Sequence, residues 1–319
     1  MRVLVTGAAG FIGSHVSDAV KTAGHELYGI DDFSSGARNL DAFEESPKNF
    51  IEHNLWRDEL SLEPEAIEFV VHCAAYPELR HNWESKQERD RLYLNNIQAT
   101  TSVLEEMPER APIIFLSSAS VYGSSSGNDA FVETSAFPET IESPYAASKM
   151  AGEALVAAYA YKRKVPWYVL RLVNAVGTRQ HRGVISDFVK MANAGHIHAA
   201  DDGKQRKSWV HVKDVADAVT TIIRETPPAG IYNVTSRERI SWWDIVDEMG
   251  FDRSRVTYEN RDRGAIGDPV NIHVSGEKLG VYYQCRRSVR EGIRESLEYA
   301  GWTRKPFDDF AEPEEPLVP

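Results

Sequence analysis

Short hydrophobic runs alternate with longer segments of helical periodicity through the first half of the chain. The hydrophobic runs are strand-sized and occupy Val3–Thr6, Glu26–Asp31, Phe50–His53, Phe69–His72, Ile113–Ser117 and Trp167–Arg171. Helical patterns fill the gaps, notably at Ile12–Ala23, Arg89–Met107 and Tyr145–Lys162. This alternation predicts an α/β fold in which crossover helices join parallel strands. Runs that are apolar at every position, such as Ile113–Leu116, are typical of strands buried on both faces.

The regular alternation weakens beyond about Val173. Glycine and charged residues interrupt it from Gly177 to Lys207. After that interruption the pattern predicts a helix at Val212–Ile223, a strand at Ile231–Val234 and a C-terminal helix at Ser288–Ala300.

We therefore expect a main domain and a smaller C-terminal α/β lobe. The main domain takes residues 1–173, with 211–240 returning to it, and the lobe takes 174–210 and 241–310. The final stretch, 311–319, has three prolines and three glutamates and is expected to be a disordered tail.

Composition and charge narrow the functional classes. The chain has 319 residues, 42% of them hydrophobic, which is enough for a large core. No apolar run reaches the length of a membrane-spanning helix, and no signal-peptide pattern precedes the first strand, so a cytoplasmic protein is expected. The formal net charge of -12 argues against a general nucleic-acid binder, although a local cationic pocket can still hold an anionic substrate. Cys73 and Cys285 indicate neither a disulfide framework nor a metal site.

A glycine-rich turn follows the first predicted strand and opens the first helix. The segment from Gly7 to Gly13 reads GAAGFIG, with glycine at positions 7, 10 and 13. Glycine lets the chain turn tightly and approach a pyrophosphate, and the free N–H groups of the helix start then face the negative charge. Ordinary turns also contain glycines, so the flanking strand and helix are part of the prediction.

Two carboxylates support a dinucleotide site and select the cofactor. Asp31 and Asp32 end the second predicted strand, 18 and 19 residues after Gly13. A carboxylate at this position accepts hydrogen bonds from the adenosine ribose and repels a 2′-phosphate. The spacing favours NAD over NADP, against the alternative of an aspartate pair in a surface turn.

A second group of residues carries the chemistry of proton transfer. Tyr145 and Lys149 are four residues apart at the start of a helical pattern, so their side chains share one face. A nearby ammonium group and a positive nicotinamide ring favour the phenolate, which can take a proton from a substrate hydroxyl. Ser118 follows the fifth strand, at the carboxyl edge of the sheet, where its hydroxyl can hold the substrate oxygen. We expect Ser118, Tyr145 and Lys149 to be the catalytic residues.

These motifs together resemble the extended short-chain dehydrogenases, and within them the NAD-dependent sugar epimerase/dehydratase family with its UDP-sugar 4-epimerases. The resemblance covers nearly the whole chain and includes MRVLVTGAAGFIGSH at the start, HCAA from His72, NIQAT from Asn96, VYG from Val121, SPYAASK from Ser143 and VHVKDV from Val210. It implies a Rossmann-type doubly wound parallel sheet with a C-terminal substrate lobe. The cofactor site that it implies comprises Gly7, Gly10, Phe11, Ile12, Gly13, Asp31, Asp32, Ser35, Asn54, Leu55, Ala74, Ala75, Asn96, Tyr145 and Lys149.

In the family that the chain resembles, the residues just after the catalytic Ser or Thr separate the reaction types. Dehydratases have acidic residues there, whereas this chain has Ala119 and Ser120, neither of which acts as an acid at neutral pH. Oxidation and reduction need no proton carrier beyond Tyr145. We therefore expect an epimerase that oxidises a nucleotide-diphosphate sugar to a keto-sugar, at C4, and reduces it on the other face. A dehydrogenase or reductase that releases NADH is the main alternative; a dehydratase and a non-catalytic NAD-binding regulator are less favoured.

The resemblance also implies substrate residues and an oligomeric state. We expect the nucleotide sugar to contact Arg80, Ser118, Ala119, Ser120, Asn174, Lys207, Arg261 and Arg263. Solvated surface charge is the alternative for Lys207, Arg261 and Arg263. A homodimer is expected, with helices near 89–107 and 145–162 pairing across a two-fold axis through Leu92, Leu94, Ile97, Leu155, Val156 and Tyr159. The identity of the sugar and of the nucleotide stays open at this point.

Overall fold

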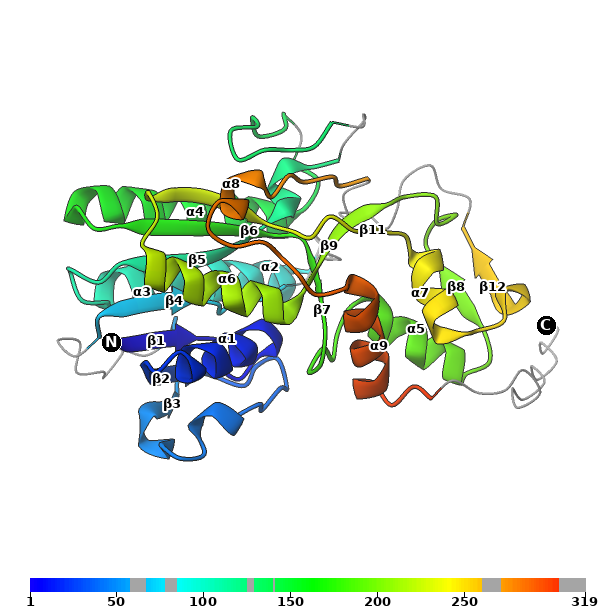
Figure 1. The fold of residues 1–319 in the computed structure, drawn as a ribbon, viewed down its shortest axis with the longest axis horizontal. Helices are drawn as coiled ribbons and strands as arrows, with labels where there is room; N and C mark the ends of the chain where they lie inside the picture. The colour runs from blue at the N-terminus through cyan, green and yellow to red at the C-terminus, as the bar shows by residue number, and fades with distance from the viewer. Residues whose placement is uncertain (58–66, 78–84, 125–128, 140, 260–270, 304–319) are drawn as a thin grey trace.

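The central element of the fold is a seven-stranded parallel sheet (Figure 1). The computed structural model describes the chain apart from residues 58–66, 78–84, 125–128, 140, 260–270 and 304–319. In sheet order the strands are β10 (Gly230–Val234), β6 (Trp167–Leu172), β5 (Ile113–Ser118), β4 (Phe69–His72), β1 (Arg2–Thr6), β2 (Glu26–Asp31) and β3 (Phe50–Glu52). The strand order reverses between β1 and β4. Thr6 at the end of β1 pairs with His72 at the end of β4, so the two strands end side by side at the carboxyl edge of the sheet. This is the doubly wound fold class that the sequence predicted.

Helices cover both faces of the sheet. On one face lie α1 (Phe11–Thr22) and α6 (Val212–Glu225); on the other lie α2 (Lys86–Leu92), the π-helical turn η4 (Tyr93–Gln98), α3 (Ala99–Glu106) and α4 (Pro144–Arg163). Residues of one strand alternate between the two layers: Val3 and Val5 pack with α1, whereas Leu4 packs with α3 and α4. The segment predicted as one helix at Arg89–Met107 begins earlier, at Lys86, and contains the π-helical turn.

The C-terminal part forms smaller layers beyond the carboxyl edge of the sheet (Figure 1). β7 (Asn174–Val176) pairs with β9 (Lys207–His211), which pairs with β11 (Arg239–Ile240), and β8 (Ile197–Ala199) pairs with β12 (Val256–Tyr258). A separate core lies among α5 (Val184–Asn193), α7 (Trp242–Met249) and α9 (Val289–Tyr299). The sequence predicted α6, β10 and α9. It missed β7, β8, β11 and β12, because two or three residues are too few to show a period, and it also missed β9, α5 and α7.

Short helical turns complete the described elements. They are η1 (Asp41–Phe43), η2 (Pro47–Asn49), η5 (Ala119–Tyr122), η6 (Arg253–Arg255) and the four-residue helix α8 (Glu277–Gly280). The turn η5 follows β5 directly, so it lies at the same sheet edge as the glycine-rich turn.

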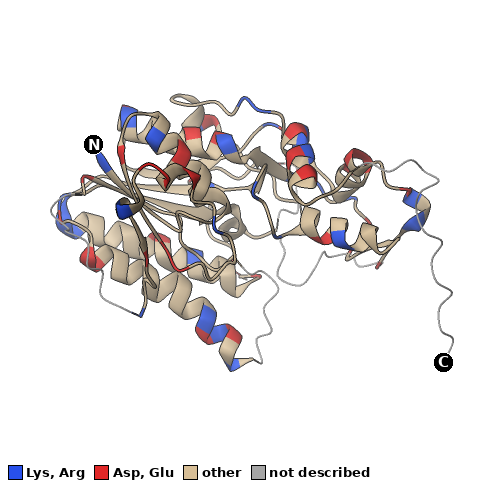
Figure 2. Cartoon of the chain, turned by 90° about the horizontal axis from the view of Figure 1, so that it is seen from below, with Lys and Arg blue, Asp and Glu red and all other residues tan. Residues whose placement is uncertain are grey.

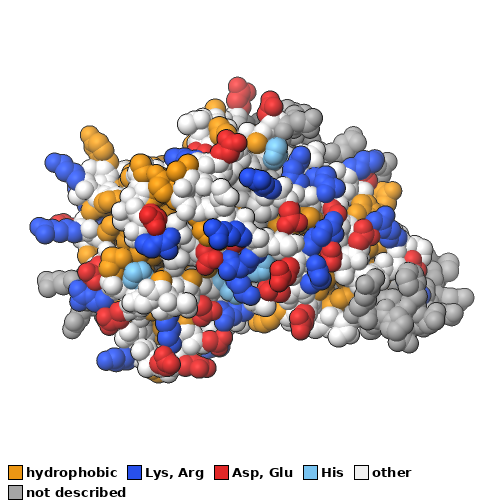
Figure 3. Space-filling view, in the orientation of Figure 1, with side chains coloured by type: hydrophobic (Ala, Val, Ile, Leu, Met, Phe, Trp, Pro, Cys, Tyr) orange, Lys and Arg blue, Asp and Glu red, His pale blue; other side chains and the backbone are white. Residues whose placement is uncertain are grey.

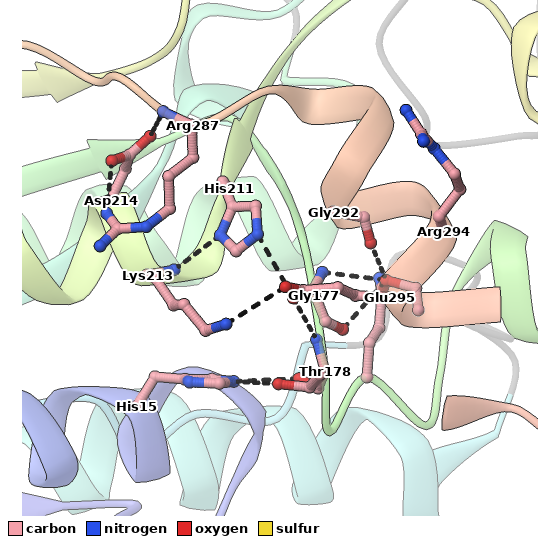
Figure 4. Close-up of polar contacts among 12 residues, drawn as sticks. His15, Gly177, Thr178, His211, Lys213, Asp214, Arg287, Gly292, Arg294 and Glu295 are labelled. Carbon is pink, nitrogen blue, oxygen red and sulfur yellow. Dashed lines mark hydrogen bonds and ion pairs between the residues drawn. The ribbon is translucent and has the colours of Figure 1, made fainter. Parts of the chain in front are cut away.

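A polar network joins the C-terminal layers to the main sheet (Figure 4). The Glu295 carboxylate of α9 accepts hydrogen bonds from Lys213 Nζ (3.2 Å) and the Thr178 backbone N–H (3.4 Å). It also lies 3.3 Å from His211 Nε2. On the opposite side, His15 Nε2 of α1 lies 3.0 Å from the Thr178 carbonyl oxygen. The network therefore ties α9 to both α6 and the glycine-rich helix α1.

Charged side chains are distributed over the surface rather than gathered by sign. Lys, Arg, Asp and Glu lie mainly on the helices and loops, and the strands of the sheet carry few of them (Figure 2). On the face shown in Figure 3, basic and acidic side chains are interspersed. Among the helices that the structure describes, none has the length and apolar character needed to cross a bilayer.

Candidate active site

The glycine-rich turn brings three segments of backbone unusually close together. Gly7 has φ +66°, and a Cβ at this position would lie 2.8 Å from the Ala74 backbone. A Cβ on Gly13 would lie 1.9 Å from the Gly7 carbonyl oxygen, so this contact requires glycine. Helix α1 starts after Gly10 with no side-chain cap and no acidic residue in its first turn. The positive helix end is thus left for an anionic group such as a dinucleotide pyrophosphate.

The carboxylates at the end of β2 organise the neighbouring loop. Asp31 is buried, and its two oxygens accept hydrogen bonds from the backbone N–H groups of Ala9 (3.0 Å) and Phe33 (2.8 Å). Burial raises the pKa of Asp31. Asp32 accepts a hydrogen bond from Asn54 Nδ2 (2.9 Å), and Asp32 and Asn54 both line a hollow of about 660 Å³. Asp31 therefore shapes the glycine turn, and Asp32 faces the hollow.

Buried polar contacts fix the end of β4 beside the glycine turn. His72 lies between two hydroxyl groups, 2.6 Å from Thr6 Oγ1 and 2.9 Å from Thr100 Oγ1. The backbone N–H of Ala74 donates a hydrogen bond to Thr6 Oγ1 (3.3 Å). This bond fixes the chain directly before Ala75, the other alanine predicted at the cofactor site. Burial lowers the pKa of His72 to about 3, so this histidine is neutral at physiological pH.

Three residues predicted at the cofactor site have contacts of their own within the protein. The Asn96 amide bonds the backbone N–H and carbonyl of Tyr76 and also donates to Ser148 Oγ (2.9 Å), so it holds the chain that follows Ala75. Leu55 is buried in the core layer next to α3. Ser35 lies in the loop after β2, where its carbonyl accepts a hydrogen bond from Arg182 Nη2 (2.9 Å).

The start of α4 places Tyr145 and Lys149 against the end of β5. Ser143 Oγ accepts a hydrogen bond from the Ala146 N–H (3.1 Å), and Pro144 occupies the first helical turn, as is typical of helix starts. Lys149 is buried and donates to the Leu116 carbonyl oxygen (2.9 Å). The Ser118 hydroxyl is close enough to Tyr145 to lower the pKa of its phenol, and the centre of the Tyr145 ring lies 5.9 Å from Lys149 Nζ. The three predicted catalytic residues thus lie together.

Burial raises the pKa of Tyr145 and lowers the pKa of Lys149, so it disfavours both the phenolate and the ammonium form. Although Tyr145 as a whole is partly exposed, desolvation of its hydroxyl raises its pKa to about 12, against a smaller lowering by Ser118. Desolvation lowers the pKa of Lys149 to about 8. Burial therefore outweighs the effect of the neighbouring protein groups on Tyr145. Additional positive charge is needed to favour the phenolate.

The predicted substrate residues that the structure describes lie at the end of β5 and on three further elements, η5, β7 and β9. Ala119 and Ser120 are buried in η5, and the Ser120 N–H donates to Ser118 Oγ (3.2 Å). Asn174 begins β7 opposite Trp209, two residues along β9 from the partly exposed Lys207. Arg80, Arg261 and Arg263, like the tail 311–319, lie outside the described residues.

Sequence reasoning did not single out a buried ion pair below Lys149. Arg171 Nη2 of β6 lies 2.7 Å from Glu153 Oε2 of α4, and both side chains are almost fully buried. The available signal was spacing, because Glu153 follows Lys149 by four residues, as Lys149 follows Tyr145. Its buried partner on another strand gave no local pattern.

Comparison with known proteins places the chain in a family. Residues 3–235 match the NAD dependent epimerase/dehydratase family. The chain is 29% identical to an uncharacterized UDP-glucose epimerase of Bacillus subtilis, over 94% of this chain and 98% of that protein. It is 27% identical to the dTDP-D-glucose 4,6-dehydratase of Bos taurus, over 100% of this chain and 93% of that protein. Epimerases and dehydratases are thus both among its relatives.

A solved structure agrees with this placement. The UDP-glucuronic acid 4-epimerase of Bacillus cereus, crystallised with UDP-glucuronic acid and NAD, superposes with a TM-score of 0.83. The two proteins are 26% identical, and the match covers 94% of this chain and 99% of that one. The chain therefore belongs to the NAD-dependent epimerase/dehydratase family, enzymes of nucleotide-sugar chemistry whose cofactor is NAD.

Proposed function

We propose that this protein is an epimerase that inverts C4 of a UDP-sugar. The observation that carries the proposal is the pair Ala119 and Ser120, which directly follows Ser118 in η5. Neither side chain can donate a proton to a leaving hydroxyl at neutral pH, so elimination of water lacks an acid at this position. Similarity to a UDP-glucose epimerase and to a UDP-glucuronic acid 4-epimerase supports the choice of uridine and of C4.

The proposed mechanism needs one proton carrier and one orienting hydroxyl. When bound, NAD would supply the hydride acceptor and donor of the reaction and a positive charge that favours the Tyr145 phenolate. The Tyr145 phenolate takes the proton of the sugar C4 hydroxyl as the C4–H bond breaks, and returns it when C4 is reduced from the other face. Ser118 holds the C4 oxygen, and the Lys149 ammonium stabilises the phenolate.

The remaining chain divides between cofactor and substrate. We propose that Gly7, Gly10, Gly13, Asp31 and Asp32 hold NAD, together with the other cofactor residues predicted from the sequence. Residues 174–210 and 241–310 form the substrate lobe in this proposal, and 1–173 with 211–240 form the NAD-binding domain. Asn174 and Lys207, on adjacent strands, supply polar contacts to the diphosphate.

The function is tested by product analysis. Purified protein is incubated with UDP-glucose or UDP-glucuronic acid, and the products are separated and identified by NMR. We expect the C4 epimer at unchanged mass and no net NADH absorbance. A product lighter by one water identifies a dehydratase, and accumulating NADH identifies a dehydrogenase; either result contradicts the proposal. Mass spectrometry of ligands released from the purified protein identifies the resident cofactor independently.

A further inference from the structure

The proposed catalytic face of α4 continues one turn beyond Lys149. Tyr145, Lys149 and Glu153 are spaced at i, i+4 and i+8, so they form one row along the helix. Helix α4 packs against β5 and β6 (Figure 1). Each member of the row contacts a different one of the last three residues of β5.

The contacts of this row fix the backbone around Ser118. Lys149 donates to the Leu116 carbonyl oxygen (2.9 Å), and Glu153 Oε1 accepts a hydrogen bond from Ser117 Oγ (2.5 Å). Tyr145 lies beside Ser118, whose hydroxyl lowers the Tyr145 pKa. Glu153 is thus anchored to the residue that directly precedes the serine expected to hold the substrate.

Arg171 holds the Glu153 carboxylate in place from the other side. Arg171 Nε and Nη2 donate to Glu153 Oε1 (3.0 Å) and Oε2 (2.7 Å), a bidentate arrangement that fixes the carboxylate plane. Glu153 and Arg171 are 6% and 2% exposed, so water does not screen the pair. The Arg171 guanidinium also lies over the Tyr122 ring, at 4.7 Å.

The carboxylate also sets the charge around Lys149. The titratable groups that face the Lys149 ammonium are Tyr145 and Glu153 on its own helix, and His72 and Cys73 at the end of β4. Burial raises the pKa of Tyr145 and of Cys73 to about 12 and lowers that of His72 to about 3. Cys73, and after it the Glu153 carboxylate that is ion-paired with Arg171, oppose the burial that lowers the pKa of Lys149. The Cys73 thiol, with its pKa near 12, carries no charge near pH 8, so the carboxylate is the partner that we test.

We propose that Glu153, held by Arg171, is a positioning residue that orients Ser118 through Ser117 and keeps Lys149 protonated. It touches neither substrate nor cofactor in this role, and it acts through these neighbours. The expected changes in turnover rest on the proposed function. The expected change in the Lys149 pKa does not depend on which substrate the protein binds.

The first test separates the charge from the hydrogen bond. In Glu153→Gln the size is kept and the charge is lost, so we expect the pKa of Lys149 to fall below its wild-type value. A fall of one unit leaves about tenfold less protonated Lys149 above the midpoint. Turnover should then fall about tenfold at alkaline pH and less at neutral pH. Glu153→Asp keeps the charge and should retain the wild-type midpoint. Ser117→Ala should lower turnover at every pH with the Lys149 pKa unchanged.

The pKa is read directly from the NAD-loaded protein. NMR of protein labelled with ¹³C at the lysine ε-carbon follows the Lys149 resonance, which is assigned by its loss in Lys149→Met. Glu153→Gln leaves Arg171 buried without its partner and can fail to fold. The double variant Glu153→Gln/Arg171→Met removes both charges, and we expect a smaller downward shift, because loss of the Arg171 cation partly offsets loss of the Glu153 carboxylate.

Two outcomes separate this inference from the proposed function. A wild-type protein that does not epimerise UDP-sugars overturns the proposed function, while the NMR titration still tests the role of Glu153. An unchanged Lys149 titration in Glu153→Gln, or in the double variant if the single variant does not fold, shows that the pair only stabilises the fold. The inference is then wrong.

Discussion

At the scale of single residues, Tyr145 is the group on which the proposed chemistry depends most directly. Tyr145→Phe keeps the ring and its packing but removes the hydroxyl that is proposed to carry the proton. Loss of a general base costs about 10² to 10⁴ in rate, so we expect a loss of this size with the fold and NAD content retained. Steady-state turnover on the true substrate measures this loss of rate.

Ser118→Ala should lower turnover less than Tyr145→Phe does, because Ser118 orients the substrate and accepts no proton. Near-normal turnover of Tyr145→Phe contradicts the mechanism.

Asp31 carries the second prediction at this scale. Its carboxylate accepts hydrogen bonds from Ala9 and Phe33 and is proposed to bind the adenosine ribose. Asp31→Ala removes these contacts and a negative charge, so NAD binding should weaken by about tenfold to a hundredfold. The preference for NAD over NADP should also lessen. Calorimetric titration with both cofactors measures this, with Asp32→Ala as the matched variant. Unchanged NAD affinity in Asp31→Ala assigns the ribose contact to Asp32 instead.

At the scale of elements, His72 links β1, β4 and α3 through Thr6 and Thr100. Its pKa is lowered from 6.5 to about 3 in the folded state by burial. The unfolded chain therefore binds a proton first as the pH falls, and the free energy of unfolding decreases from pH 6.5 towards 3. The largest slope from one such group is about 1.4 kcal/mol per pH unit.

The His72→Gln variant isolates this contribution. Its free energy of unfolding should depend less steeply on pH between 6.5 and 4 than that of the wild type. Urea denaturation at several pH values measures both slopes. The difference at pH 8, where His72 is neutral in both states, reports the lost hydrogen bonds alone. Equal slopes for the two proteins contradict the assignment of this titration to His72.

At the scale of the whole molecule, we predict a homodimer formed by α2, η4 and α4. Tyr93 is 53% exposed and borders a hollow lined by Ile97, Pro144 and Ala147. Two residues that the sequence suggested for the interface, Leu92 and Val156, are instead buried in the core of the single chain. Arg89 and Ser148 also line this hollow. A two-fold interface uses the same patch on both subunits, so we expect this hollow and Tyr93 to meet their own copies.

Sedimentation at micromolar concentration tests this assembly. Tyr93→Arg should shift the protein from dimer to monomer, because it introduces a charge into the expected interface. Tyr299→Arg, at an exposed position on α9, is the matched control and should leave the dimer intact. A wild-type monomer contradicts the prediction.

Sequence by itself determined the features that depend on local pattern. The β-strands of the main sheet, the glycine turn and the spacing of Tyr145 and Lys149 are readable because neighbours in the chain produce them. Continuous apolar runs such as Phe69–Val71 correctly predicted strands that are buried on both faces. The strands of two or three residues in the C-terminal part are too short to show any pattern in the sequence.

Only the tertiary structure decided which distant side chains meet and how burial changes them. Arg171 reaches Glu153 because β6 lies beside β5 under α4, and Glu295 meets Lys213 across 82 residues of chain. The raised pKa of Tyr145 likewise depends on how the fold excludes water from its hydroxyl, which no spacing reveals. Sequence thus determined which residue types were present and near one another in the chain. The fold determined their partners and charge states, because contact and desolvation are properties of three-dimensional packing.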